Sequence, residues 1–183
     1  MLKPGQIIKE FKSKKGNLFT LRIPQVSDAP GLMRSTNSVI AEDYFLIMNK
    51  KLNLQQEKQW LHDRISDIKK GNGVMICTLH KKRIVGHCDI VKSPGRSSHI
   101  GNLGIIITED HRKEGVGMAL IQEVLKIAKN ELAIQSAILG VYKTNKQAID
   151  FYYKAGFQEF GVLPKEALIK GNYVDGICMY KEL

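Results

Sequence analysis

Hydrophobic and polar residues alternate along this chain with two different periods, and these periods predict both strands and helices. Alternation at every second position over Phe19–Ile23 is typical of a half-buried strand, and Pro24 ends it. Ser27 and Asp28 then offer caps for a helix. Between residues 54 and 70 apolar side chains recur at helical spacing with charges between them, which predicts a second helix that ends at the following glycines.

The remainder of the chain reads as a short meander of strands followed by alternating strands and helices. The pattern predicts strands at Val74–Leu79, Arg83–Val91, His99–Thr108, Ala137–Val141, Phe157–Leu163 and Tyr173–Lys181, and helices at Gly115–Asn130 and Asn145–Ala155. This order predicts an α/β fold in which a mixed central β-sheet is flanked by helices on both faces. The crossover through the helix that begins at Gly115 implies that the strands on either side of it are parallel.

Length and composition limit the class of protein. A chain of 183 residues fits a single domain spanning 1–183. No apolar run approaches the ~20 residues that cross a bilayer, and the basic N-terminus lacks the apolar core of a secretory signal. The three cysteines, an odd number scattered through apolar patterns, suit buried thiols in a reducing compartment. We therefore expect a cytoplasmic protein with no membrane association.

The net charge of +10 is compatible with two kinds of ligand, because it could attract a nucleic acid or a small polyanion. The lysines are dispersed and form no sustained basic helix. We therefore expect no nucleic-acid partner, and a lysine-rich surface that also steers an anionic cofactor. A metal site is also not expected: Cys77, His80, His87 and Cys88 flank a predicted hairpin, but adjacent strand residues such as His87 and Cys88 point to opposite faces.

The turn after the strand that ends at Thr108 is the first candidate for chemistry. It runs through Arg112 and Lys113 to Gly115 and Gly117 and leads directly into a helix. The start of a helix leaves several main-chain N–H groups unpaired at the positive end of the helix dipole, and glycines let an anion approach them. A P-loop would need Gly-Lys-Ser/Thr, and a dinucleotide fingerprint needs three spaced glycines; neither fits. The turn alone does not exclude an ordinary strand-to-helix connection.

Two motifs in sequence order give the turn a family resemblance. Arg112-Lys-Glu-Gly-Val-Gly117 matches the Arg/Gln-x-x-Gly-x-Gly/Ala signature of the GNAT acetyltransferase superfamily, and Asn145–Phe157 resembles its Asn-x-x-Ala-x-x-aromatic-Tyr-x-x-x-Gly-Phe motif. The resemblance is strongest over approximately 99–157, the expected cofactor-binding core. The segments at His99 and at Tyr173 resemble the branch that acetylates amines and amino acids. The resemblance implies a GNAT-like fold, acetyl-CoA as cosubstrate and N-acetyltransferase activity.

The resemblance also implies roles for individual residues. The expected cofactor contacts are main-chain groups of Ile105, Ile106 and Ile107 at the pantetheine and thioester, the pyrophosphate cradle of Arg112, Lys113, Glu114, Gly115, Val116, Gly117 and Met118, and the second motif's Asn145, Ala148 and Tyr152. Helical spacing independently places Asn145, Ala148 and Tyr152 on one face. Tyr152 is the expected catalytic residue, although a core tyrosine at that position would give the same pattern.

The expected reaction is direct attack of an amine on the acetyl thioester. An N–H near Ile105–Ile107 would stabilise the oxyanion, and Tyr152 would donate to the departing thiolate. An alkylammonium of pKa ~10.4 must first lose a proton, so a base or a water chain should help. The region His99–Asn102 lacks the carboxylate that some family members have. The base stays open between Glu42, Asp43, His99 and Asp175.

The acceptor is less defined than the cofactor. The residues expected at its site are Glu42, Tyr44, His99, Tyr173 and Asp175, with Phe45 beside them, and Asp175 would serve equally as a counter-ion for an ammonium group. A primary amine of a small molecule or amino acid is the expected substrate. A protein N-terminus or lysine is the alternative acceptor, and a non-catalytic acyl-CoA-binding module is the alternative from another class. Because dimers are common in the family, a homodimer is compatible with the resemblance.

Overall fold

The sheet is the frame on which the predicted turn is mounted. A computed structural model describes residues 2–42, 46 and 48–183. Within this part of the chain, one sheet of eight strands has the order β1-β2-β3-β4-β5-β6-β8-β7. The strands are β1 (Ile7–Lys12), β2 (Leu18–Arg22), β3 (Gly73–His80), β4 (Arg83–Lys92), β5 (Ile100–Ile107), β6 (Ser136–Tyr142), β7 (Gln158–Ile169) and β8 (Asn172–Glu182). Neighbours are antiparallel except β5 and β6, which are parallel, so the predicted mixed sheet and its crossover are confirmed.

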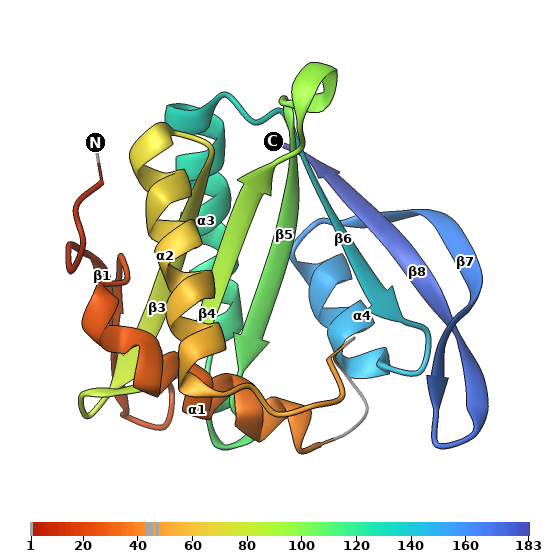
Figure 1. Cartoon of the computed structure of the whole chain (residues 1–183), viewed down its shortest axis with the longest axis horizontal. Coiled ribbons are helices and arrows are strands. Elements are labelled where there is room, and N and C mark those ends of the chain that lie inside the picture. The colour runs from red at the N-terminus through yellow and green to blue at the C-terminus, as the bar shows by residue number, and fades with distance from the viewer. Residues whose placement is uncertain (1, 43–45, 47) are drawn as a thin grey trace.

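Helices cover both faces of the sheet, as predicted (Figure 1). The helices α1 (Ala29–Ile40) and α2 (Leu54–Lys70) lie on one face, and α3 (Val116–Leu132) and α4 (Lys146–Lys154) lie on the other. The bounds of α2 follow from its ends: the Asn53 side chain accepts the N–H of Gln56, and Gly71 closes the helix in the left-handed region at φ 68°. No helix in the described residues is long and apolar enough to cross a membrane.

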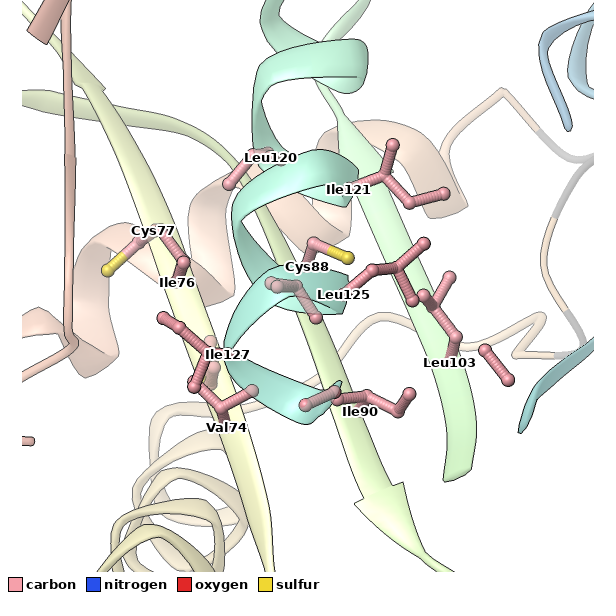
Figure 2. Packing of buried hydrophobic residues seen from close by; sticks show 14 of the residues in the cluster. Val74, Ile76, Cys77, Cys88, Ile90, Leu103, Leu120, Ile121, Leu125 and Ile127 are labelled. Atoms are coloured by element: carbon pink, nitrogen blue, oxygen red, sulfur yellow. The ribbon is translucent and has the colours of Figure 1, made fainter. Parts of the chain in front are cut away.

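The largest block of buried side chains lies between α3 and the centre of the sheet (Figure 2). Ile76, Cys88 and Ile90 are fully buried and face Leu120 and Ile121 of the helix. Each large apolar side chain removed from water in this way contributes roughly 2 kcal/mol. The packing holds the start of α3 at a defined place beside the end of β5.

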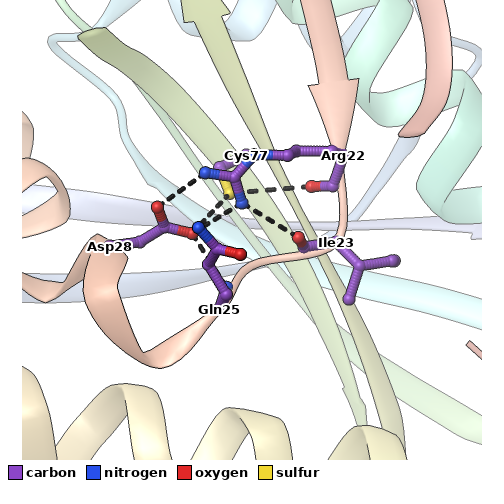
Figure 3. A network of polar contacts seen from close by, with 5 residues as sticks. All are labelled: Arg22, Ile23, Gln25, Asp28 and Cys77. Carbon is purple, nitrogen blue, oxygen red and sulfur yellow. Dashed lines mark hydrogen bonds and ion pairs between the residues drawn. The ribbon is translucent and has the colours of Figure 1, made fainter. Parts of the chain in front are cut away.

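A buried polar network joins β2 to α1 on the opposite face (Figure 3). Arg22 donates to both carboxylate oxygens of Asp28 at 2.7 and 2.6 Å, and the N–H of Gln25 donates to the same carboxylate at 2.8 Å. The Cys77 thiol donates to the carbonyl of Arg22. Asp28 thus occupies the position before α1 that the sequence predicts, but its carboxylate binds Arg22 and the N–H of Gln25 and makes no capping hydrogen bond to α1. The network orients α1, whose far end leads to Glu42.

The sheet opens between β5 and β6, which pair over Ile100–Asn102 and Ser136–Ile138 and, among the residues described, no further. Figure 1 shows the two strands meeting at one end and diverging toward the other, with α4 visible in the opening. The antiparallel ladder between β4 and β5 continues along the whole length of β5. One edge of β5 is therefore paired throughout, and the other edge is unpaired beyond Asn102.

One strand was missing from the prediction. The sequence analysis placed the first strand at Phe19–Ile23, but β1 precedes it and pairs with β2 at the edge of the sheet. An edge strand has a weaker amphipathic pattern because both faces keep contact with water, and β1 is exposed or half-buried along its whole length. The other predicted elements are present with ends that shift by a few residues, most of all in β7, which continues to Ile169.

Candidate functional site

The turn between β5 and α3 presents a row of unpaired main-chain donors. Lys113 and Gly115 both adopt positive φ, at 60° and 85°, and Gly115 caps α3 without a side chain. From Lys113 to Met118, no main-chain N–H group donates to an acceptor in the part of the chain that the structure describes. Such groups at the positive end of a helix form a cradle for an anion. The geometry agrees with the pyrophosphate role expected from the sequence, which stays a prediction.

The side chain of Glu114 is directed away from this cradle into the turn between β1 and β2. Its carboxylate accepts from the hydroxyl of Ser13 at 2.8 Å and from the amide of Asn17 at 2.9 Å. These hydrogen bonds, that of Asn17 first, lower the pKa of the carboxyl below its usual value. Among the residues of the turn, Glu114 thus has a side chain with a structural role, because its carboxylate is already hydrogen-bonded within the protein. It anchors the turn to the β1–β2 hairpin, of which only β2 was predicted from the sequence.

Arg112 joins the turn to the segment that follows α1. Its guanidinium donates to both oxygens of Glu42 at 2.7 and 2.5 Å, and its Nε donates to the carbonyl of Ile107 at 3.1 Å. About a fifth of each charged side chain is exposed, 22% for Arg112 and 18% for Glu42. A bidentate pair of this kind has a defined geometry. Glu42, a candidate base in the sequence analysis, uses both carboxylate oxygens to hold Arg112.

The main-chain N–H and C=O groups of alternate residues in β5 point either toward β4 or toward the opening. The N–H of Thr108 donates to Val85 on β4, and the carbonyl of His99 accepts from residues at the start of β6. Because backbone groups alternate in direction along a strand, those of Ile105 and Ile107 face the opening toward β6, whereas those of Ile106 belong to the ladder with β4. Of the three predicted contacts, Ile105 and Ile107 can offer main-chain groups to a ligand in the opening, and Ile106 cannot.

The second motif forms α4, which closes the opening from the face that α3 covers. Asn145 caps α4 by accepting the N–H of Ala148 at 3.1 Å. Tyr152 is 8% exposed and lies against Phe151 and Phe157, with ring centroids 5.4 and 5.9 Å apart. The ring of Phe151 in turn lies close to Gly117, where a Cβ would come within 3.2 Å of it. The start of α3 and the middle of α4 are thus in contact.

The phenol of Tyr152 is buried within electrostatic reach of Cys88 on β4. Burial raises the pKa of Tyr152 well above its usual value, and nearby Cys88 raises it further. Cys88 is the cross-strand partner of Ile105 in the β4–β5 ladder. The hydroxyl therefore stays protonated at physiological pH and keeps its proton for hydrogen-bond donation.

The predicted acceptor residues are not all brought together. His99 lies just before β5, and the turn follows the other end of this strand. The length of β5, roughly 25 Å, therefore separates His99 from the turn. Tyr173 is 66% exposed on the β7–β8 hairpin. Asp175 on the same hairpin accepts the N–H of Lys165 and pairs with Lys143, and these contacts, that of Lys165 first, lower the pKa of its carboxyl. Asp43, Tyr44 and Phe45 lie outside the described residues.

Comparison with known proteins connects this geometry with a family. The family model described as "Acetyltransferase (GNAT) family" matches residues 40–157, which include the turn, the edge of β5 and α4. The chain belongs to the GNAT acetyltransferase family. The resemblance drawn from the two sequence motifs is confirmed.

Relatives of this GNAT protein differ in the acceptor that their names give. L-amino acid N-acetyltransferase AaaT of Escherichia coli (strain K12) is 36% identical over 97 residues, which are 52% of this chain and 60% of AaaT, so the match spans less than two thirds of that relative. An N-alpha-acetyltransferase of Sulfolobus acidocaldarius is 27% identical over 173 residues, 92% of this chain and 93% of the relative. The fold is that of yncA from Salmonella typhimurium, solved with its cofactor acetyl-CoA, at a TM-score of 0.81 with 14% identity over 90% of this chain and 94% of that one.

Two features of this GNAT domain escaped the sequence analysis. A groove of about 560 Å³ begins at Met118 and runs along α3, and four lysines line it: Lys126, Lys129, Lys154 and Lys181. The other feature is Glu166 of the β7–β8 hairpin, whose carboxylate lies beside Tyr142 of β6. No local motif marks either one, because their residues come from separate elements. The pair Lys126 and Lys129, three residues apart on α3, was the signal available in the sequence for the groove.

Proposed function

We propose that this GNAT protein is an acetyl-CoA-dependent N-acetyltransferase that transfers an acetyl group to the primary amine of a small molecule or amino acid. The observation that carries the proposal is the continuity of two unpaired main-chain surfaces. The edge of β5 beyond Asn102 leads directly to the unbonded N–H groups of the turn. A ligand with an extended polar arm and a pyrophosphate matches both surfaces at once.

The cofactor contacts follow from this match. The pyrophosphate of acetyl-CoA would accept from the N–H groups between Lys113 and Met118. The pantetheine arm would lie along β5 like a short strand, exchanging hydrogen bonds with Ile105 and Ile107. The carboxamide oxygen of Asn145 caps α4, so its NH₂ is the group that would donate to the arm. The lysines of the groove that runs along α3 from Met118 add positive charge on this side of the molecule, which attracts a polyanionic ligand over a longer range.

The reaction would proceed without an acyl-enzyme. The neutral amine attacks the carbonyl carbon, and the oxyanion of the tetrahedral intermediate accepts from the N–H of Ile105. The C–S bond then breaks, and Tyr152 donates a hydrogen bond to the sulfur as charge develops there. The raised pKa of this phenol makes full proton transfer to a thiolate of pKa about 8.5 uphill, so hydrogen-bond donation is the larger part of its role. The amine's proton leaves to water.

A protein N-terminus is the second candidate acceptor, and the match to an N-alpha-acetyltransferase over nearly the whole chain favours it. The small-molecule acceptor is favoured by AaaT, which has the higher identity over a shorter segment. The two differ in the size of the groove they need beside the opening. A panel of free amino acids and diamines, run beside short peptides with free N-termini, separates them by which group releases CoA.

The first experiment is thermal unfolding with and without acetyl-CoA. A ligand at ~100 times its dissociation constant adds about 2.7 kcal/mol to stability, which raises Tm by several degrees. Protein shown by mass spectrometry to carry no CoA should respond to acetyl-CoA and to CoA, and not to adenosine. An unchanged Tm would contradict the cofactor site. A raised Tm without CoA release for any amine would leave a binding module as the function.

A further inference from the structure

The β7–β8 hairpin contains an irregularity that brings one carboxylate onto the sheet. The pairing register shifts between Leu163 and Ala167, and Lys165 adopts a positive φ of 54° within this bulge. The N–H of Lys165 donates to Asp175 at 3.1 Å and holds the bulge in place. The next residue, Glu166, is half-buried. Its side chain folds back over β8.

Gly176 makes room for this carboxylate. A Cβ at Gly176 would overlap the Oε2 and Cδ atoms of Glu166, so the carboxylate occupies the space that a side chain would take. The backbone of Gly176 lies outside the left-handed region, so its conformation does not require glycine. The absence of a side chain at this position therefore serves the placement of Glu166.

The carboxylate lies next to the opening of the sheet. Gly176 is the cross-strand partner of Tyr142 on β6, the strand that borders the opening. Their side-chain positions point to the face opposite Ile177 and Met179, which are buried with Tyr152 on the side of α4. Glu166 thus lies on the far side of the sheet from Tyr152. Burial raises the pKa of Tyr142, and the charge of Glu166 beside it raises the pKa further.

No described residue neutralises Glu166. Neither a hydrogen bond nor an ion pair to its carboxylate is present in the part of the chain that the structure covers. Lys143 pairs with Asp175 at 3.5 Å, and the ammonium of Lys165 lies over the ring of Tyr173, 5.4 Å from its centroid. A carboxylate left unpaired beside the opening favours a cation from outside the protein.

We propose that Glu166 selects acceptors that carry a second ammonium group, such as diamines and free lysine, an inference that rests on the proposed acetyl transfer at the same opening. The reacting amine would reach the thioester between β5 and β6, and the second ammonium would pair with Glu166 above Gly176. One to two strand spacings separate these points, about 5–10 Å. That span matches two amines joined by a chain of four or five carbons.

Matched acceptors test the second charge directly. Lysine and norleucine differ by the terminal ammonium group, as do 1,4-diaminobutane and butylamine. With wild-type protein the dicationic member of each pair should have the lower KM, by about tenfold. Glu166→Gln should raise KM for lysine and diaminobutane to the level of the monoamines. The KM values for acetyl-CoA, norleucine and butylamine should stay within about twofold.

Gly176→Ala tests the placement without changing any charge. The added methyl group displaces the Glu166 carboxylate, so this variant should lose the preference for dications as Glu166→Gln does. Gly161→Ala is the control, because Gly161 lies on the same hairpin and an added Cβ meets nothing within 4 Å. It should keep the wild-type preference. Unfolding curves of all three variants with acetyl-CoA report whether the fold and the cofactor site are intact.

Several outcomes would overturn the inference. Equal KM for the two members of each pair in the wild-type protein would remove the second charge from recognition. A loss of kcat for monoamines in Glu166→Gln, together with a shifted pH profile, would make the residue a base rather than a selector of acceptors. A protein that binds acetyl-CoA but acetylates none of these amines would refute the proposed function itself, and that result is distinct from uniform turnover without preference.

Discussion

The proposed cofactor side and the proposed acceptor side of the opening are built in different ways. The cofactor side consists mainly of main-chain groups in one continuous segment, from Ile105 through the turn to Met118. On the acceptor side, the described residues contribute side chains from separate elements: Glu42 after α1, Tyr142 on β6 and Glu166 on β7. One side is therefore specified by a local stretch of sequence, and the other depends on how distant elements meet.

The strongest test of this contrast is Tyr152→Phe, the one side chain on the cofactor side to which we assign chemistry. Removing its hydroxyl should lower kcat by about 10²-fold, because the departing thiolate loses its hydrogen-bond donor. The KM for acetyl-CoA should stay within a few-fold. Tyr153→Phe is a matched control, since its hydroxyl contacts Glu159 on the exposed side of α4. Similar kcat values for the two variants would remove Tyr152 from catalysis.

The main-chain cradle can be distorted by a single methyl group at Gly115. At φ 85° an alanine is strained by ~1–2 kcal/mol, so Gly115→Ala should shift the turn and weaken acetyl-CoA binding by about tenfold. Titration calorimetry measures the dissociation constant. Gly71→Ala carries comparable strain at the end of α2, with open space around it. That variant should lose stability but keep cofactor affinity; equal losses of affinity would contradict the cradle.

The variant Glu42→Gln tests whether Glu42 acts as the general base or only holds Arg112 in position. Because both carboxylate oxygens are engaged by Arg112, we expect kcat within about threefold of wild type. The partly buried pair should cost about 2 kcal/mol when broken, which appears as a fall in Tm of several degrees. Arg112→Lys should produce a similar fall. If turnover instead fell by roughly two orders of magnitude and the acidic limb of the pH profile disappeared, Glu42 would be the base.

The smallest expected effect concerns a buried carboxyl in the first turn of α2. Glu57 is 1% exposed, and burial raises its pKa to about 7 from 4.5. The folded protein therefore loses stability as the pH rises through this range, since the charged form must stay buried. Glu57→Gln should raise Tm by a few degrees at pH 8 and by less at pH 5. Exposed Glu131→Gln is the control, and an equal change at both pH values would contradict burial as the cause.

Most of the fold could be predicted because most of its helices and strands have a recognisable local sequence pattern. The helix over 54–70 has a clear period and a glycine end, and the structure places α2 over the same residues. The parallel pair on either side of α3 followed from the crossover. The strand β1 could not be predicted in the same way, because it lies at the edge with no face fully buried and so leaves no strong alternation in the sequence.

The candidate site divides in the same manner. The turn at Arg112–Gly117 is one contiguous segment, so its motif could be recognised in the sequence. Which residues of β5 direct their main-chain groups toward the opening could be decided only from the pairing of β5 with β4. Glu166 was not predicted, because nothing in its own segment indicates that a bulge and a glycine ten residues later place its carboxylate beside Tyr142. The predicted importance of His99 rested on its position in a motif, and the direction of β5 places it at the far end.

The main-chain character of the β5 edge has a consequence for divergence within the family. Every L-amino acid except proline offers the same N–H and C=O groups, so other substitutions along this edge leave the proposed hydrogen bonds to the cofactor in place. On the acceptor side each contact depends on a particular side chain, and one replacement changes what is recognised. A lineage can therefore exchange its acceptor while it keeps its acetyl donor, which agrees with relatives that are named for different acceptors and share about a third or less of this sequence.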